Sequence, residues 1–398
     1  MQTSSPRDRV DKVRERIHFP RLDGLRSVAA LAVVVAHLES KKGHFGFGEH
    51  ALPRLLFLGQ TGVSLFFVLS GYLITFLLLV ERQIAGTIDI KKFLIRRALR
   101  IWPLYFLILL LGFFFVPQIS FFDVPGQTEH LQRHFLLKLL LFLAFQPNLA
   151  LIVFAPIPYA SQAWSIGIEE QFYVAWPFVV RRARSVVAVA TTIIAAVAIA
   201  RGGVELLRAF APLGPRPRFL VELASRFFLY SRYECMAVGA IFAALAFEGR
   251  AAFLRTRAAS LLALVLLCLF FSFDASLPFL GHLPQALGFG LLVTCLAHGP
   301  NEVGPFRLLE TPLMMYLGKI SYGIYMVHLL CITPAGKATA ALLPPSAPSL
   351  SVHGLLYTFT LALVLGVSAL SYRFLEKPFL RLKDRFTIVR SGAQDPTH

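Results

Sequence analysis

The sequence predicts an all-α, polytopic integral membrane protein, and three observations support this prediction. Of the 398 residues, 56% are hydrophobic and only 15% are charged, whereas a soluble globular protein carries roughly 25% charged residues. Apolar runs long enough to cross a bilayer recur along the chain. The net charge of +17 comes from 39 basic and 22 acidic residues, and the basic residues cluster between these runs. Membrane topology explains that charge more simply than binding of nucleic acid, which we do not expect.

Ten segments are predicted to cross the membrane, which we take to be the inner (cytoplasmic) membrane of a cell. Basic residues concentrate in the connections assigned to the inside, and the short outside connections are poorer in them. This bias predicts that both termini lie in the cytoplasm. The predicted crossings are residues 22–40, 58–80, 98–117, 162–180, 185–201, 227–247, 258–275, 283–299, 313–334 and 354–376.

One further apolar segment, residues 135–154, is predicted not to cross. An eleventh crossing would move the basic residues at 181–184 to the outside. Lys138 lies near the start of the segment, and the sequence Gln146-Pro147-Asn148 interrupts its middle. These polar residues predict a broken, re-entrant or interfacial piece.

The chain divides into three predicted parts. Residues 1–21 form a cytoplasmic N-terminal segment, residues 22–380 form the transmembrane domain, and residues 381–398 form a basic cytoplasmic tail predicted to be disordered. The four cysteines lie inside apolar runs and lack metal-ligand spacing. We therefore expect free thiols and no metal site.

The first apolar run carries a stripe of polar side chains. Arg26 and His37 are eleven residues apart, so on a helix they share a face about 16 Å apart along the axis, with Asp23 one turn before Arg26. Arg26 could simply reach the inner membrane surface, and His37 could cap the outer helix end. The alternative interpretation makes His37 a base or a nucleophile, because its imidazole titrates near neutral pH.

Two other stretches carry small or basic residues inside or beside an apolar run. The small residues of 59–75, such as Gly62 and Gly71, favour close helix packing, and Tyr72 could place a hydroxyl in a pore. Arg97 and Arg100 are three residues apart at the cytoplasmic start of a helix and face the same way. They could anchor the helix at the inner surface, or they could bind phosphates as a pair of guanidinium groups.

Carboxylates and a second histidine occur in two later runs. Ser165 and Glu169 are four residues apart and share one face of an apolar helix that also contains Trp164. A carboxylate so far inside a membrane helix predicts a functional role for Glu169. In the run 318–330, His328 should lie at the same depth as His37, and Tyr322 and Tyr325 add hydroxyl groups. A hydrogen-bonded structural histidine remains the alternative for His328.

These pieces, in this order, resemble the membrane-bound acyltransferase 3 family. The Arg/Lys-x10-His signature of that family falls on Arg26 and His37, and its Arg-x-x-Arg falls on Arg97 and Arg100. Ser64 departs from the pattern, because many members have aspartate there, and we assign no carboxylate role to that position. The two remaining elements fall on Trp164, Ser165 and Glu169, and on Ser321, Tyr322, Tyr325 and His328.

The resemblance implies transfer of an acetyl or other short acyl group from cytoplasmic acyl-CoA to a hydroxyl of a glycan or glycoconjugate, such as a cell-surface polysaccharide or lipopolysaccharide. Acyl-CoA is a substrate here, and no tightly bound cofactor is expected. We expect Arg97 and Arg100 to hold the CoA phosphates. His37 would act as general base with Arg26 beside it and Glu169 or Asp23 tuning its charge, or would carry the acyl group itself. Candidate substrate contacts are Trp164, Ser165, Tyr72, Tyr322, Tyr325 and His328.

Other interpretations remain open at this point. A secondary transporter or flippase for a lipid-linked or small anionic substrate would also place charged residues at mid-depth. If the protein is an acyltransferase, its acceptor could instead be a macrolide-type small molecule. A third class of function is a non-catalytic membrane partner in a polysaccharide complex. The expected binding partners are membrane lipid, acyl-CoA and the acceptor, and no oligomeric state is predicted.

Overall fold

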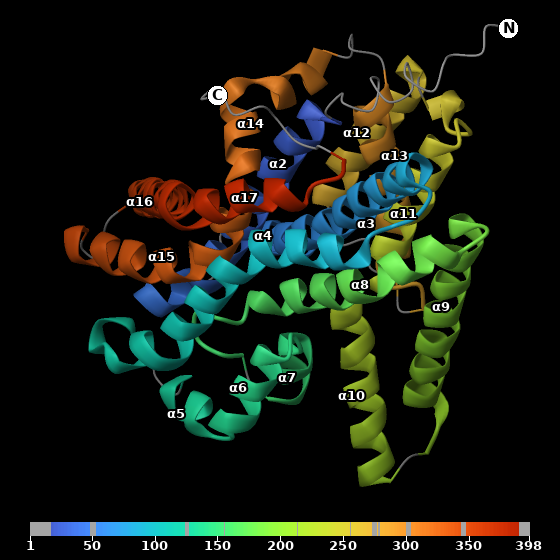
Figure 1. Cartoon of the computed structure of the whole chain (residues 1–398). Helices are drawn as coiled ribbons and strands as arrows, with labels where there is room; N and C mark the ends of the chain where they lie inside the picture. The colour runs from blue at the N-terminus through green and yellow to red at the C-terminus, as the bar shows by residue number, and fades with distance from the viewer. Residues whose placement is uncertain are drawn as a thin grey trace, which may run out of the picture.

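The computed structural model describes residues 17–47, 53–123, 127–154, 156–212, 214–254, 256–272, 277, 279–299, 304–343 and 348–389. Within these ranges the regular elements are helices and no strand is present, which confirms the predicted all-α class (Figure 1). The α-helices are α2 (Pro20–Lys41), α3 (Phe57–Ala85), α4 (Ile90–Leu110), α5 (Gln127–Gln132), α6 (Phe135–Leu143), α7 (Pro147–Val153), α8 (Ala163–Arg182), α9 (Val186–Phe210), α10 (Pro215–Ser231), α11 (Tyr233–Phe247), α12 (Arg257–Ser272), α13 (Leu283–His298), α14 (Pro312–Lys319), α15 (Ser321–Leu342), α16 (Ser349–Ser371) and α17 (Lys377–Lys383).

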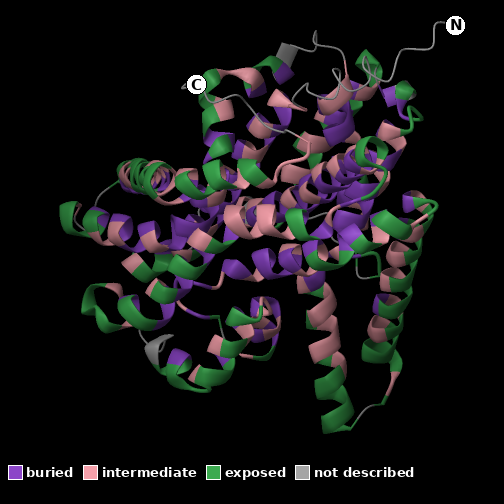
Figure 2. Cartoon of the chain, in the orientation of Figure 1, coloured by how far each residue is buried: buried purple, intermediate pink, exposed green. Residues whose placement is uncertain are grey.

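Helices α2, α3, α8 and α11 form the buried centre of the molecule, and the other helices surround them (Figure 2). Close approach of α3 and α11 depends on glycine. A Cβ atom added at Gly71 would collide with the Met236 carbonyl, and one added at Gly239 would collide with the Val68 carbonyl. The predicted role of small residues in close helix packing is therefore confirmed for α3.

Several helices are long and apolar enough to cross a membrane, as a multi-pass membrane protein requires. Five such stretches are present in the described residues, or six if the pair α14 and α15, which meet at 71°, counts as one broken span. The ten predicted segments each contain helix, but α12 and α13 have only 16 residues each. The five stretches are Phe57–Ala85, Ile90–Gln118, Val186–Phe210, Pro215–Phe247 and Ser349–Phe386.

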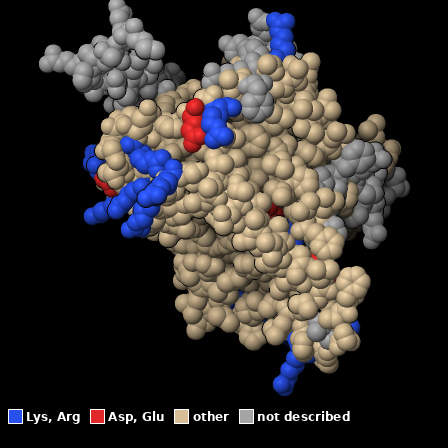
Figure 3. Space-filling model, turned by 90° about the vertical axis from the view of Figure 1, so that its right-hand side faces the viewer, with Lys and Arg blue, Asp and Glu red and all other residues tan. Residues whose placement is uncertain are grey.

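The outer surface of these helices is apolar. Only 17% of the most apolar window of α9 is buried, and the corresponding share for the stretch that includes α16 is 22%. Figure 3 shows a face covered mainly by uncharged residues, with Lys and Arg gathered at its edges. Contiguous exposed apolar surface of this kind is unfavourable in water but stable in lipid.

The predicted break within 135–154 is confirmed. Two short helices, α6 and α7, replace one spanning helix, and Phe145 between them has a positive φ of 55°. The side-chain amide of Gln171 donates to the Phe145 carbonyl and to Gln146 Oε1, each at 3.0 Å. The neighbouring helix α8 therefore satisfies the backbone that the break exposes.

Two boundaries differ from the predicted ones. The connection predicted at 202–226 is mostly helical, because α9 extends to Phe210 and α10 begins at Pro215, and the bend between α10 and α11 falls at Arg232, whose φ is 44°. The segment 381–386, which the sequence places in a disordered tail, is helical here, and the Arg96 guanidinium donates to the Phe386 carbonyl at its end at 2.9 Å. Residues 390–398 of that predicted tail lie outside the described residues, as do residues 1–16 of the predicted N-terminal segment.

Candidate active site

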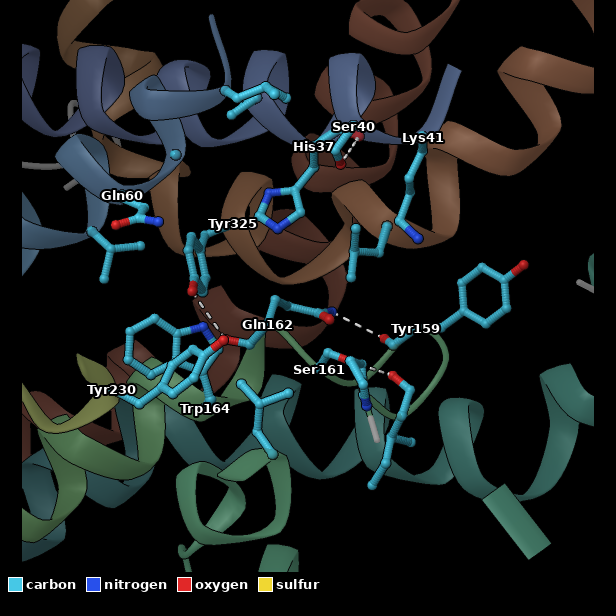
Figure 4. Close-up of a pocket in the computed structure, with 18 of the residues that line it drawn as sticks. His37, Ser40, Lys41, Gln60, Tyr159, Ser161, Gln162, Trp164, Tyr230 and Tyr325 are labelled. Atoms are coloured by element: carbon cyan, nitrogen blue, oxygen red, sulfur yellow. Dashed lines mark hydrogen bonds between the residues drawn. The ribbon is translucent and has the colours of Figure 1, made fainter. Parts of the chain in front are cut away.

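A cavity of about 450 Å³ lies at the end of α2 that carries His37. Its walls come from α2, α3, α10, α15 and the segment that leads into α8 (Figure 4). This volume is within the range of pockets that bind drug-sized ligands, about 300–1,000 Å³. The polar side chains in the lining are His37, Ser40, Lys41, Gln60, Tyr159, Ser161, Gln162, Trp164, Tyr230, Arg232 and Tyr325.

The backbone of α2 fixes the orientation of the His37 ring. His37 Nδ1 lies 3.0 Å from the Val33 carbonyl, one turn earlier. A carbonyl oxygen only accepts hydrogen bonds, so Nδ1 carries the proton and Nε2 of the neutral ring keeps its free lone pair. The His37 side chain points into the cavity in Figure 4. The geometry therefore provides a base or nucleophile at the cavity wall.

His328 lies beside His37, which agrees with the similar depth predicted for the two residues. The two ring centroids are 4.8 Å apart. His328 Nδ1 is bonded to the Tyr325 carbonyl at 2.6 Å, and Nε2 is buried with no partner among the described residues. His328 does not line the cavity, so it can position His37 but has no direct access to a ligand there.

Tyr325 closes one side of the cavity and connects it to α8. Its hydroxyl donates to the Gln162 carbonyl at 2.9 Å and accepts from Ser165 Oγ at 2.7 Å. Ser165 lies behind Tyr325 and does not line the cavity. Trp164 does line it, and the Trp164 and Tyr230 rings meet edge to face with centroids 5.3 Å apart.

Arg232 is a site residue that the sequence reasoning missed. Its guanidinium bonds the Gln60 carbonyl at 2.9 Å and Ser64 Oγ at 3.1 Å, and it lies 5.6 Å from the centroid of the Trp164 ring. Ser64 is the position at which many family members have aspartate, so in this chain a neutral hydroxyl meets the arginine. An arginine at the start of an apolar run was the available signal, but no motif placed it near His37.

A second cluster of charged side chains lies at the other end of α2. Arg26 Nε donates to Ser321 Oγ at 3.4 Å, and Arg26 interacts electrostatically with Arg100, Asp23 and Glu169. Arg26 therefore shares α2 with His37 as predicted, but it belongs to a different site.

Glu169 is held among these cations by hydrogen bonds. Its Oε1 accepts from Ser70 Oγ at 2.9 Å, and its Oε2 accepts from the Tyr173 hydroxyl at 2.8 Å. Glu170 faces another direction, where its Oε2 accepts from Trp102 Nε1 at 3.2 Å. Neither carboxylate is bonded to His37.

The arginines of the 96–100 segment differ from one another. The Arg96 guanidinium already forms an ion pair with Glu81 at 2.9 Å, so it is less available to a ligand. Arg97 lies over the rings of Phe93 and Tyr173, and its Nε is buried without a partner among the described residues. Arg97, Arg100 and Lys383 of α17 interact electrostatically with one another. Like charges repel, so this cluster favours an anionic ligand.

Three further predicted site residues also do not line the cavity. Asp23 pairs with His18 at 2.9 Å and is fourteen residues, or about 21 Å of helix, from His37, so it cannot tune the imidazole as predicted. The Tyr72 hydroxyl is fully buried beside His298 Nε2 at 2.8 Å. Tyr322 donates to the Ile101 carbonyl at 2.8 Å, near the arginine cluster. Among the described residues there is also no group of His, Cys, Asp and Glu suited to a metal ion.

Comparison with known proteins agrees with the resemblance found in the sequence. A family model described as "Acyltransferase domain" matches residues 19–373, so the chain belongs to the acyltransferase 3 family. The chain is 27% identical over 335 residues to "Putative peptidoglycan O-acetyltransferase YrhL" of Bacillus subtilis, an alignment that covers 80% of this chain and 49% of that protein. It is 32% identical over 166 residues to "Peptidoglycan O-acetyltransferase OatA" of Listeria monocytogenes, covering 41% and 24%.

The chain thus spans at most about half the length of these curated relatives. No solved structure matches the chain.

Proposed function

We propose that the protein is a membrane O-acyltransferase that moves an acetyl or other short acyl group from acyl-CoA to a hydroxyl of a glycan or glycoconjugate. The observation that carries this proposal is the free Nε2 of His37 at the wall of a cavity, with Nδ1 fixed by the Val33 carbonyl. Membership of an acyltransferase family supplies the reaction class.

The chemistry follows from the position of this nitrogen. His37 Nε2 removes the proton from the acceptor hydroxyl, and the oxygen attacks the carbonyl of the thioester. The carbon–sulfur bond then breaks, and the imidazolium returns its proton to the CoA sulfur. The products are an O-acyl ester and CoA. Direct attack by Nε2, with an acyl-imidazole as intermediate, is the alternative route through the same atom.

The donor is proposed to bind at the opposite end of α2. Arg97 and Arg100 lie on one face of α4, and the Nε of Arg97 has no partner among the described residues. The phosphates of CoA would compensate the repulsion between these cations, and arginine suits phosphate because of its planar, bidentate donors. The acyl arm would then extend along α2 toward His37.

The acceptor is proposed to be a cell-surface polysaccharide. The relatives are named for O-acetylation of peptidoglycan, and a lipopolysaccharide or another envelope glycan has the same chemistry. Acylation of a macrolide-type molecule or transport of an anionic substrate would use the same cavity. Membership of an acyltransferase family favours the enzyme over the transporter.

We further propose the inner membrane, ten crossings and cytoplasmic termini. Contacts between segments support this arrangement, because segments assigned to one side meet one another. The end of α3 meets the end of α8 where Arg82 bonds the Ala183 carbonyl at 3.1 Å, and α4 meets α17 near Phe386. On the other side, Tyr357 of α16 bonds Glu39 at 2.6 Å.

Mass spectrometry of surface glycans from cells with and without the gene tests the proposal. An O-acyl group present only in cells with the gene is the expected result. Unchanged glycans, together with gene-dependent uptake of a solute, would contradict the acyltransferase proposal and favour a transporter. Binding of CoA to detergent-purified protein, lost in Arg97→Ala, tests the donor independently.

A further inference from the structure

The cavity at His37 has an unbalanced charge. Its lining contains two cations, Lys41 and Arg232, and none of its described lining residues is Asp or Glu. Burying positive charge without a counter-charge is costly in a membrane protein. Such a lining therefore favours a ligand that brings a negative charge with it.

Lys41 is available to that ligand, whereas its neighbour Lys42 is not. Lys42 is buried and donates to Glu39 Oε2 at 2.7 Å and to His353 Nε2 at 3.0 Å, and the Tyr357 hydroxyl occupies the other Glu39 oxygen. Lys41 makes no hydrogen bond or ion pair with any described residue, and it lies close enough to interact electrostatically with His37. Figure 4 shows its side chain beside the same cavity.

The second cation, Arg232, is bonded but not neutralised. Its described hydrogen bonds go to neutral oxygens, those of Gln60, Ser64 and the Leu229 carbonyl. The nearby carboxylate of Glu234 pairs instead with Arg201 at 3.4 Å. The positive charge of Arg232 therefore adds to that of Lys41 at the cavity wall.

The lining also offers the groups that a sugar ring needs. Gln162 Oε1 is buried and has no partner among the described residues, although the same amide donates to the Met326 carbonyl at 2.6 Å. Gln162 is only 2% exposed and lines the cavity, so a ligand hydroxyl is the natural donor for that oxygen. Trp164 and Tyr230 supply the apolar faces.

We propose that the acceptor is a sugar that carries a carboxylate, and that Lys41 recognises this carboxylate. The inference rests on the proposed function and specifies its substrate class. Lys41 is four residues after His37, so the two Cβ atoms lie about 5–6 Å apart on one face. The carboxylate at Lys41 and the reacting hydroxyl at His37 then belong to the same or an adjacent sugar. Arg232 contributes to the potential, and Gln162 orients the ring.

The test is performed in cells from which the gene is deleted, which receive the wild type, Lys41→Met, Lys41→Arg or Lys337→Met. Lys337 is a matched control, because it is a lysine near the same membrane surface that does not line the cavity. Mass spectrometry identifies the acylated sugar and measures its acylation. We expect the ester on an acidic sugar, a loss of roughly ten- to hundredfold in Lys41→Met, and retention in Lys41→Arg and Lys337→Met.

The outcomes separate this inference from the proposed function. An ester on a neutral sugar, or wild-type acylation in Lys41→Met, overturns the role of Lys41 and leaves the acyltransferase intact. An absence of any gene-dependent ester overturns both. If Lys41 acts only through His37, purified Lys41→Met shows a shifted pH profile of transfer and an unchanged KM for the acceptor. That result also contradicts recognition of the acceptor carboxylate by Lys41. Equal membrane yield and equal CoA binding of Lys41→Met show that the variant is folded.

Discussion

The two ends of α2 carry the same kinds of residues in different arrangements. At the Arg26 end, cations and carboxylates alternate, and Glu169 lies among arginines with both oxygens hydrogen-bonded. At the His37 end, cations face an open volume of about 450 Å³ without a described carboxylate in its lining. The Arg26 end thus combines bonded carboxylates with a cluster of cations, Arg97, Arg100 and Lys383, that phosphates can neutralise. The His37 end has cations without a described carboxylate in the lining, which favours an anionic acceptor.

The largest effect is expected from His37→Ala. Removing the base at the cavity should lower acyl transfer by about 10²- to 10⁴-fold, while CoA binding at the Arg97 end is retained. Transfer by purified protein and CoA binding measured on the same sample check this prediction. His328→Phe keeps a ring against His37 and should cost much less. Equal losses of transfer in the two variants would contradict the assignment of His37, and not His328, as the base.

Arg97→Ala should have the next largest effect. Losing charged hydrogen bonds to phosphate should raise the KM for acyl-CoA roughly ten- to hundredfold with little change in kcat. Arg96→Ala is the matched control, because Arg96 already pairs with Glu81 and the Phe386 carbonyl. Steady-state kinetics with varied acyl-CoA concentration measure the KM in both variants. The same KM increase in Arg97→Ala and Arg96→Ala would contradict a specific phosphate site at Arg97.

Glu169→Gln should change stability more than donor binding. The substitution removes the negative charge that faces Arg26 and Arg97, and it should destabilise the protein by about 1–3 kcal/mol. The KM for acyl-CoA should not rise, since the cations remain. Thermal unfolding in detergent measures the change, with the exposed Glu248→Gln as control. A rise in KM without destabilisation would place Glu169 in donor binding instead.

The smallest effect is expected from Tyr72→Phe. It removes the hydrogen bond between the tyrosine hydroxyl and His298, worth about 0.5–1.5 kcal/mol, and should leave transfer unchanged because Tyr72 does not line the cavity. Melting temperature and transfer rate are measured on the same preparation. A tenfold loss of transfer would indicate that Tyr72 contacts substrate, as the sequence predicted.

The sequence was most informative where helical periodicity alone fixes positions. The placement of Arg26 and His37 on one face follows from 3.6 residues per turn, and the break within 135–154 follows from its polar centre. The cavity could not be predicted in this way, because its walls come from segments far apart in the chain. Arg232 lies at the bend between α10 and α11, where its φ is 44°, and it lines the same cavity as His37. The separation of Asp23 from His37, in contrast, follows from the helix rise, which places them about 21 Å apart.

In the proposed reaction, an acyl group enters at the Arg97 end of α2 and is delivered at the His37 end. This transfer across the membrane can be measured in sealed vesicles with the cytoplasmic face outward, with labelled acyl-CoA added outside and the acceptor glycan enclosed inside. We expect label on the enclosed glycan in the wild type and none in His37→Ala. Labelling only when donor and acceptor are present on the same side would contradict it.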